Sequence, residues 1–258
     1  MTQQKKAERH EEKRYVVIYG FTKQELSKIM KHFEAQLPDN VKINIENKNL
    51  ITKITLTGLD YGGVELLRFK MNRFHSTLTT MFAHELVSIE NKTVAQVLGE
   101  LLTDLELTVA SAESCTGGNI AHKITQVPGS SAYFVGSLVS YSNDVKAEVL
   151  KVNRNLISRE GAVSKPVVES MAEGVSNLMR SDCSISTSGI AGPDGGSKFK
   201  PVGTVWVAAK YRDKLVSECK HFTGDRDAVI ESATNHGMVM LIKLLRNTYE
   251  EEEDINDD

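Results

Sequence analysis

"TVAQVLGELLTDLELTVASAESCTGGNIAHKI", residues 93–124, contains a helix pattern, a strand pattern and a turn into a second helix. Thr93 and Gln96 have the spacing of a capping box, in which two side chains each satisfy a free amide at a helix start. Apolar residues then recur at helical spacing: Val94, Val97, Leu98, Leu101, Leu102 and Leu105. A short strand is predicted at 107–110, and polar residues with a glycine pair follow at 113–118. This order of elements predicts an α/β domain that begins near residue 91.

The chain beyond this stretch continues the alternation. Strands are predicted at 138–141, 184–188 and 202–209, with helical stretches between them. A last helix is predicted from about Asp225 to Leu245, and the acidic segment 250–258 is expected to be a solvated tail because its charges repel one another. We therefore expect an α/β fold over 91–249, with a predominantly parallel sheet and flanking helices.

The first part of the chain has a different pattern. A charged N-terminal segment (1–13) precedes a strand, and Thr22 with Glu25 forms another capping box at the start of a helix. Alternating apolar residues at 41–45 and 54–56 indicate a hairpin with one buried face, and a second helical stripe runs over 64–82. These elements predict a small α+β domain over 14–90.

Composition narrows the classes of function. The chain has 258 residues, a formal net charge of -3 and a sequence pI near 6.2, which give no electrostatic reason to expect nucleic acid or membrane as a partner. No apolar run approaches the roughly 20 residues of a membrane span, and the charged N-terminus lacks the apolar stretch of a signal peptide. The three cysteines and seven histidines are scattered, without the spacing of a metal site. We expect a cytoplasmic protein with reduced thiols and no metal.

Three polar segments follow predicted strands, where open α/β sheets bind ligands. The first contains Glu113, Ser114, Thr116, Gly117 and Gly118, which can present hydroxyls and closely approaching backbone to a ligand. Cys115 can simply pack there. A purely structural alternative, in which Ser114 or Thr116 only caps a helix, is equally compatible with the pattern.

The second segment brings a serine and a lysine into the same region, Ser131 and Lys146, with Tyr141 and Asn143 between them. A lysine can activate a serine nucleophile when burial lowers its pKa, although most such pairs are surface residues. The third segment, 188–196, is rich in glycine and typical of a loop with exposed amides; Arg226 lies further on and suits a phosphate.

Seven motifs occur in an order and spacing that resemble the carboxy-terminal domain of the CinA family, which includes nicotinamide-nucleotide amidohydrolases. They are AESCTGG (112–118), VPGSSAYF (127–134), VSYSNDVK (139–146), GAVS (161–164), SGIAGPDGG (188–196), KPVGTVW (200–206) and GDRD (224–227). The segment at 14–90 more loosely resembles the KH-type domain that precedes it in longer CinA proteins. The large molybdopterin-binding-like amino-terminal domain of those proteins has no counterpart in this sequence, so its activity is not carried over.

The resemblance implies hydrolysis of nicotinamide mononucleotide (NMN) to nicotinic acid mononucleotide and ammonia, without a cofactor. It implies Ser131 as nucleophile and Lys146 as its base, with Tyr141 orienting nearby groups and Ser114 as the rival nucleophile. Substrate-binding residues expected from the motifs are Glu113, Thr116, Gly117, Gly118, Asn143, Gly192, Gly195, Gly196 and Arg226.

Two other classes of function stay open at this point. One is a non-catalytic interaction protein associated with competence or DNA damage; retention of the polar motif residues favours the enzyme instead. The other is a phosphate-handling enzyme or nucleotide sensor, which no carboxylate cluster supports. A KH-type first domain gives little support to RNA binding because no GXXG loop joins two helices. The resemblance also implies a homodimer.

Overall fold

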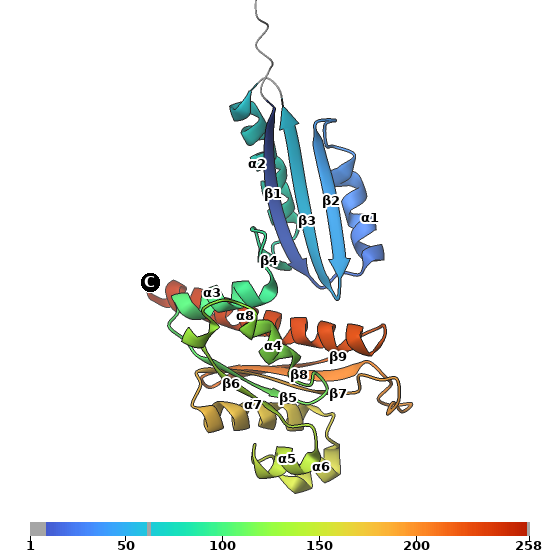
Figure 1. Cartoon of the computed structure of the whole chain (residues 1–258), viewed down its shortest axis with the longest axis vertical. Helices are drawn as coiled ribbons and strands as arrows, with labels where there is room; N and C mark the ends of the chain where they lie inside the picture. The colour runs from blue at the N-terminus through green and yellow to red at the C-terminus, as the bar shows by residue number, and fades with distance from the viewer. Residues whose placement is uncertain (1–8, 61–62, 257–258) are drawn as a thin grey trace, which may run out of the picture. The chain divides into compact units, whose positions relative to one another are not determined.

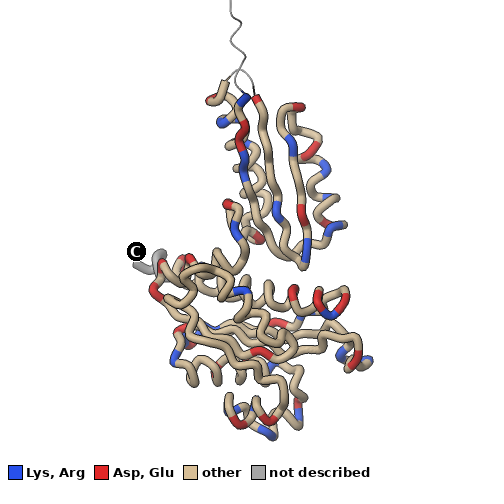
Figure 2. Tube along the Cα trace, viewed as in Figure 1, with Lys and Arg blue, Asp and Glu red and all other residues tan. Residues whose placement is uncertain are grey.

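The computed structural model describes residues 9–60 and 63–256, and the chain divides into two compact units, residues 1–92 and 93–258 (Figure 1). Most of the expected N-terminal segment 1–13 and the end of the expected tail 250–258 therefore lie outside the described residues. Acidic and basic residues are interspersed within each unit (Figure 2). No helix in the described part of the chain is both long and apolar enough to cross a membrane.

The first unit combines an antiparallel sheet with two helices. Its elements in chain order are β1 (His10–Tyr19), α1 (Lys23–Glu34), β2 (Val41–Lys48), β3 (Ile51–Asp60), α2 (Val64–Met81) and β4 (Leu86–Ser88). The sheet order is β2-β3-β1-β4. The chain runs from β1 through α1 to β2, and β3 then inserts between these two strands, which is a split β-α-β arrangement. The capping box of Thr22 and Glu25 and the hairpin are confirmed. The assignment of this unit to the KH class stays a prediction.

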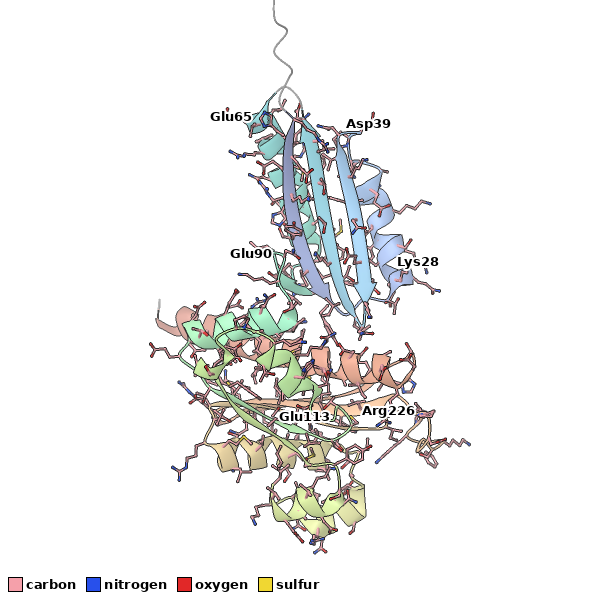
Figure 3. All side chains as sticks on the ribbon, viewed as in Figure 1. Lys28, Asp39, Glu65, Glu90, Glu113 and Arg226 are labelled. Atoms are coloured by element: carbon pink, nitrogen blue, oxygen red, sulfur yellow. The ribbon has the colours of Figure 1, made fainter. Side chains whose placement is uncertain are left out.

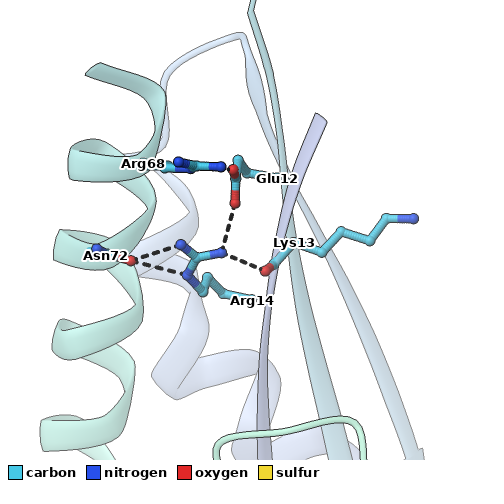
Figure 4. Close-up of polar contacts among 5 residues, drawn as sticks. All are labelled: Glu12, Lys13, Arg14, Arg68 and Asn72. Carbon is cyan, nitrogen blue, oxygen red and sulfur yellow. Dashed lines mark hydrogen bonds and ion pairs between the residues drawn. The ribbon is translucent and has the colours of Figure 1, made fainter. Parts of the chain in front are cut away.

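The sheet of the first unit buries one face against both helices. The core gathers apolar residues from β1, β2, β3, α1 and α2, which gives the strands their alternation of buried and more exposed residues. Polar contacts also tie β1 to α2 (Figure 4): Arg14 donates to Asn72 Oδ1 at 2.9 and 3.0 Å and pairs with Glu12, which also pairs with Arg68. Apolar burial and this network together fix α2 on the sheet.

The second unit contains the elements predicted from residues 93–124 and those that follow. They are α3 (Val94–Asp104), β5 (Val109–Glu113), α4 (Asn119–Thr125), the 3₁₀ turn η1 (Ser130–Ala132), β6 (Phe134–Val139), α5 (Asn143–Glu148), α6 (Arg154–Glu160), α7 (Lys165–Met179), β7 (Cys183–Gly189), β8 (Thr204–Tyr211), β9 (Lys214–His221) and α8 (Arg226–Asn256). The capping box of Thr93 and Gln96 opens α3 as predicted. The α/β fold class is therefore confirmed.

The sheet of this unit is mixed rather than predominantly parallel. Its order is β6-β5-β7-β8-β9; β5 pairs in parallel with β6 and β7, whereas β8 pairs antiparallel with β7 and β9. The strand β9 was not predicted, and a tight turn at residues 212–213 joins it to β8, which requires antiparallel pairing. The expected parallel arrangement thus holds for the three strands whose ends carry the polar motifs.

Helices cover both faces of the five-stranded sheet (Figure 1). The helix α7 lies on one face, and α3, α4 and α8 lie on the other. The strand β7 has the sequence CSISTSG, yet it is buried because its serine hydroxyls bond to the α7 side: Ser184 donates to the carbonyl of Ala172 and Ser186 to that of Val168. This pattern positions the end of β7 against the loop before α7.

The last helix is longer than predicted. It extends to Asn256 and therefore includes most of the acidic segment that was expected to be a solvated tail. Glutamate is a good helix former, and Lys214 of β9 pairs with Glu251 at 2.8 Å, so the repulsion between the acidic side chains does not end the helix at Leu245.

Candidate active site

A pocket of about 230 Å³ opens at the carboxyl ends of the parallel strands. Because β5, β6 and β7 run in the same direction, the segments that follow them meet at one edge of the sheet. The pocket is lined by Ser114, Cys115, Tyr141, Asn143, Lys146, Ala162, Val163, Ser188, Gly189, Ala191 and Arg226. It therefore brings together residues from five of the seven motifs quoted in the sequence analysis.

Lys146 is the buried lysine of this pocket. It lies on α5 with 1% of its surface exposed, and its Nζ atom contacts three oxygen atoms. These are Ser114 Oγ at 3.1 Å, the Ser140 carbonyl at 2.7 Å and the Tyr141 carbonyl at 3.2 Å. Burial lowers the pKa of Lys146 from its ordinary value, because a charged amine loses its hydration there.

The three contacts are compatible with both protonation states of Lys146, because an ammonium can donate one N–H to each of the three oxygens. A neutral amine has two N–H groups and one lone pair, and the two carbonyls are positioned to accept both N–H groups. Lys146 Nζ donates to Ser114 Oγ at 3.1 Å in the structure; in the neutral state the lone pair is left for this oxygen and can accept the proton of the serine. Ser114 itself is 9% exposed, and its amide donates to the Thr187 carbonyl at 3.0 Å, which fixes the serine at the end of β5.

The predicted pairing of Ser131 with Lys146 is not found in the structure. Ser131 lies on the exposed turn η1, it is absent from the pocket lining, and Lys146 is occupied by Ser114 instead. The physical reason is that η1 precedes β6, whereas Lys146 follows it, so the strand separates them. The geometry supports Ser114, the rival nucleophile of the sequence analysis.

Cys115 lines the pocket beside Ser114, yet its chemistry differs. The thiol is 6% exposed, and burial raises its pKa to about 12. A thiol must lose its proton to act as a nucleophile, so Cys115 packs as a neutral side chain near neutral pH. The other two cysteines, Cys183 and Cys219, are also free thiols.

Glu113, labelled in Figure 3, was expected to bind substrate, but its carboxylate contacts the turn that follows β5. Its side chain is fully buried and does not line the pocket. The carboxylate accepts hydrogen bonds from the amides of Gly118, Ile120 and Ala121 at 2.9–3.1 Å and from the Thr116 hydroxyl at 2.7 Å. It therefore satisfies the free amides at the start of α4.

The other residues of the first motif shape the same turn. Thr116 is buried between Glu113 and Thr187, so its hydroxyl is used inside the protein. Gly117 and Gly118 have φ angles of 60° and 100°, which glycine adopts without strain. None of the three lines the pocket. Their contacts in the structure shape the turn that carries Ser114, and their role in substrate binding stays a prediction.

Arg226 lines the same pocket from the start of α8. Its guanidinium donates to the Gly192 carbonyl and lies 3.5 Å from the Tyr141 hydroxyl. Asp225 caps the helix by accepting from the amide of Ala228. Tyr141 and Asn143 line the pocket as expected, whereas Gly192, Gly195 and Gly196 do not, and Gly192 contributes by holding Arg226.

Sequence reasoning did not assign a role to one wall of the pocket. Ala162 and Val163 precede α7, and the Ser188 hydroxyl donates to the Ala162 carbonyl at 2.7 Å. Lys200 donates to the Val163 carbonyl at 2.7 Å and so joins this wall to the loop between β7 and β8. Both segments belong to motifs quoted in the sequence analysis, GAVS and KPVGTVW, and this membership could have indicated that they lie at the site.

Within residues 9–60 and 63–256, no group of histidine, cysteine or carboxylate side chains could hold a metal ion.

The fold and pocket define an α/β protein in which a buried lysine is hydrogen-bonded to a serine at a strand end. A family model described as the CinA C-terminal domain matches residues 91–245. This match covers more than half of the chain, so the chain belongs to the CinA family.

Individual relatives agree with this membership. The chain is 46% identical over 157 residues to the nicotinamide-nucleotide amidohydrolase PncC of Escherichia coli (strain K12), which covers 60% of this chain and 95% of that protein. It is 35% identical over 215 residues to a CinA-like protein of Geobacter metallireducens, which covers 83% of this chain. The match spans 51% of that relative, so the chain covers about half of its length.

Solved structures show the same domain. A CinA superfamily protein from Klebsiella pneumoniae matches with a TM-score of 0.58 and 31% identity over 60% of this chain and 99% of that chain. A competence/damage-inducible protein from Agrobacterium tumefaciens matches with a TM-score of 0.57 and 34% identity over 61% of this chain and 98% of that chain. These likenesses support the architecture around the pocket.

Proposed function

We propose that this protein hydrolyses the carboxamide of NMN to nicotinic acid mononucleotide and ammonia. The observation that carries the proposal is the contact of 3.1 Å between the buried Lys146 Nζ and Ser114 Oγ at the carboxyl end of β5. The name of the Escherichia coli relative, a nicotinamide-nucleotide amidohydrolase, supports NMN as the substrate. Neither argument involves Ser131.

The proposed reaction proceeds through an acyl-enzyme. Neutral Lys146 takes the proton of Ser114 while Oγ attacks the carboxamide carbon, which forms a C–O bond and a tetrahedral oxyanion. Collapse of this intermediate breaks the C–N bond, and Lys146 returns the proton to the departing ammonia. Water, deprotonated by the same lysine, then attacks the ester carbon; Ser114 leaves with the proton and nicotinic acid mononucleotide is released.

Backbone amides of the turn after Ser114 can stabilise the oxyanion. The amides of Gly118, Ile120 and Ala121 are taken by Glu113, and those of Gly117 and Asn119 by carbonyls of the same turn. The amides of Cys115 and Thr116 have no acceptor on another described residue. The amide that directly follows a nucleophile is a common oxyanion donor, so Cys115 is the first candidate.

Arg226 provides the charge for the phosphate end of the substrate. The Gly192 carbonyl holds one nitrogen of the guanidinium, and Tyr141 lies beside the other. A guanidinium presents several N–H donors in a fixed plane, which suits the oxygens of a phosphate. In this arrangement the nicotinamide ring lies toward Ser114 and the phosphate toward α8.

The test is an assay of the purified chain with NMN in the presence of a chelator, in which ammonia and nicotinic acid mononucleotide are both measured. We expect equal amounts of the two products. Ser114→Ala should reduce kcat by at least about a thousandfold, whereas Ser131→Ala, the matched control, should stay within about twofold of the wild type. Absence of both products while a known deamidase is active would reject the amidase; loss of activity in Ser131→Ala alone would reject Ser114 as nucleophile.

We further propose that the chain forms a homodimer. In its support, β6 is an edge strand of the five-stranded sheet, and Val135 and Val139 on it are 48% and 45% exposed. Exposed apolar edge strands tend to pair with another chain. Sedimentation equilibrium should give twice the chain mass, and Val135→Lys should shift the protein toward the monomer. A monomer at all tested concentrations would reject the dimer.

A further inference from the structure

The segment that forms one wall of the Ser114 pocket, residues 160–163, is held by side chains. Ala162 and Val163 of this wall segment line the pocket, and the segment joins the end of α6 to α7. Each of its four carbonyls accepts a hydrogen bond from a side chain: Glu160 from Lys200 at 3.2 Å, Gly161 from Ser164 at 2.8 Å, Ala162 from Ser188 at 2.7 Å and Val163 from Lys200 at 2.7 Å. Two of the four hydrogen bonds therefore come from Lys200.

Lys200 reaches the wall segment from the loop between β7 and β8, residues 190–203. Backbone hydrogen bonds between Ile190 and residues 203–204 close the base of this loop at 2.8 and 2.9 Å. Near its tip, the amide of Lys200 donates to Ser197 Oγ at 3.0 Å, and the amide of Ser197 donates to the Lys200 carbonyl at 2.8 Å. An ammonium has three N–H donors, and its charge strengthens each hydrogen bond, so one lysine can hold both carbonyls of the wall segment.

The same loop holds Arg226, because its Gly192 carbonyl accepts a hydrogen bond from the guanidinium. The two arms of the loop are in close contact: a Cβ atom on Gly192 would come within 2.5 Å of Val202 Cγ1, and one on Gly196 within 2.8 Å of the Val202 amide nitrogen. Lys200 stands two positions before Val202. It therefore connects the wall segment with the part of the loop that holds Arg226.

The contacts that place the nucleophile and the base are separate from those of Lys200. Ser114 is fixed by the Thr187 carbonyl, and Lys146 contacts Ser114 and the carbonyls of residues 140 and 141. A change at Lys200 should therefore leave the reacting groups in place and alter only the wall of the pocket.

We propose that Lys200 is a positioning residue for substrate binding: it holds the wall segment in a fixed place relative to the loop that anchors Arg226. This inference rests on the proposed hydrolysis of NMN in the same pocket. A wall that is free to move contacts the parts of the substrate that do not react less well, in the ground state and in the transition state alike. Such a loss of uniform binding raises KM and leaves kcat unchanged.

The test compares full-chain variants in two assays, the steady-state kinetics with NMN and the calorimetric Kd of the product, nicotinic acid mononucleotide. We expect Lys200→Met to raise KM by about tenfold and to keep kcat within about twofold of the wild type. The Kd of the product should rise in parallel with KM. Lys200→Arg retains several N–H donors and should bring KM to within about threefold of the wild-type value.

Lys198→Met is the matched control, because Lys198 is an exposed lysine two positions earlier in the same loop. This variant should keep the wild-type KM, kcat and Kd. Circular dichroism establishes that each variant is folded at the assay temperature, and Lys200→Gln, which keeps a polar side chain at this position, provides the same comparison if Lys200→Met does not fold.

An unchanged KM and Kd in the folded Lys200 variants, or an equal rise in Lys198→Met, would overturn the inference. A fall in kcat with KM unchanged would overturn it as well. Because the calorimetric assay does not require turnover, a wild type that binds the product but does not hydrolyse NMN would reject the proposed reaction alone. Absence of both turnover and binding in the wild type would reject both proposals.

Discussion

Lys146 shows how a single buried residue connects stability with reactivity. Two backbone carbonyls and Ser114 surround its Nζ atom, and burial lowers its pKa. The folded chain therefore releases this proton at a lower pH than the unfolded chain does. The property that makes Lys146 a usable base also reduces the stability of the folded chain wherever the lysine is ionised when unfolded.

This shift predicts a specific dependence of stability on pH. Between the lowered pKa of Lys146 and its ordinary value of 10.5, the unfolded chain binds more protons than the folded chain. The free energy of unfolding should therefore increase as pH rises through this window. Below the window, the destabilisation caused by burying the ionised lysine has its full value. Lys146→Met removes this contribution. The free energy of unfolding of the wild type minus that of the variant should therefore increase with pH.

Urea denaturation at several pH values between neutral pH and the ordinary lysine pKa of 10.5 measures this difference. Lys165→Met is the control, because the side chain of Lys165 is 59% exposed and its removal should leave the wild-type slope unchanged. Identical slopes for the wild type and Lys146→Met would show that the burial of Lys146 does not shift its proton equilibrium.

The nucleophile illustrates what the sequence can and cannot reveal at this scale. The types of residue needed for a serine and lysine pair were recognised, and Lys146, Tyr141, Asn143 and Arg226 do line the pocket. The sequence could not decide between Ser114 and Ser131 as the partner of Lys146, because this depends on which strand end faces α5. Only the parallel register of β5 and β6 places Ser114, 32 positions away, within 3.1 Å of Lys146.

At the scale of elements, the turn from β5 into α4 determines the position of Ser114 in the site. Its carboxylate, Glu113, takes three backbone amides and the Thr116 hydroxyl inside the protein. Glu113 is the last residue of β5, in which all five residues are buried, so the carboxylate has no access to water. The conformation of the turn, and with it the position of Ser114, depends on this one acceptor.

Replacing Glu113 by glutamine tests that dependence. The amide NH₂ group would face N–H donors of the turn, leaving buried groups without acceptors at a cost of about 2–3 kcal/mol of unfolding free energy. Turnover should fall as well, because Ser114 would shift relative to Lys146. Urea denaturation and the deamidation assay measure the two effects.

Glu231→Gln is the comparison for this experiment. The side chain of Glu231 is 30% exposed and pairs with Lys123, so its replacement should cost no more than about 1 kcal/mol. Glu113→Gln with wild-type stability would mean that the buried hydrogen bonds of the carboxylate are not required for the turn.

Elements with a strong local signal were predictable, and those set by tertiary contacts were not. The capping boxes at Thr22 and Thr93 determine where α1 and α3 begin, and both were recognised. The edge strand β9 was missed because its exposed sequence KLVSECKH lacks a clear buried face. The strand β6 begins at Phe134 rather than at 138, since pairing with β5 sets its bounds.

At the scale of the whole molecule, the two units differ in what they contribute to the proposed reaction. Every residue that lines the pocket of Ser114 lies within residues 93–258. The supporting contacts of Glu113, Lys146 and Arg226 lie within the same unit. The first unit has its own core and its own network around Arg14, so neither unit needs apolar residues of the other to complete the cores described.

This division predicts that residues 93–258, produced alone, fold and deamidate NMN with a kcat within about threefold of the full chain, because the groups that act in the transition state are all retained. The Escherichia coli relative supports this expectation, since 95% of its length matches only 60% of the present chain. Circular dichroism establishes whether the fragment is folded, and the assay of ammonia and nicotinic acid mononucleotide gives its rate. In the fragment, Ser114→Ala should remain inactive, which shows that the activity comes from the same pocket. A folded fragment without activity would assign the first unit a direct part in the reaction.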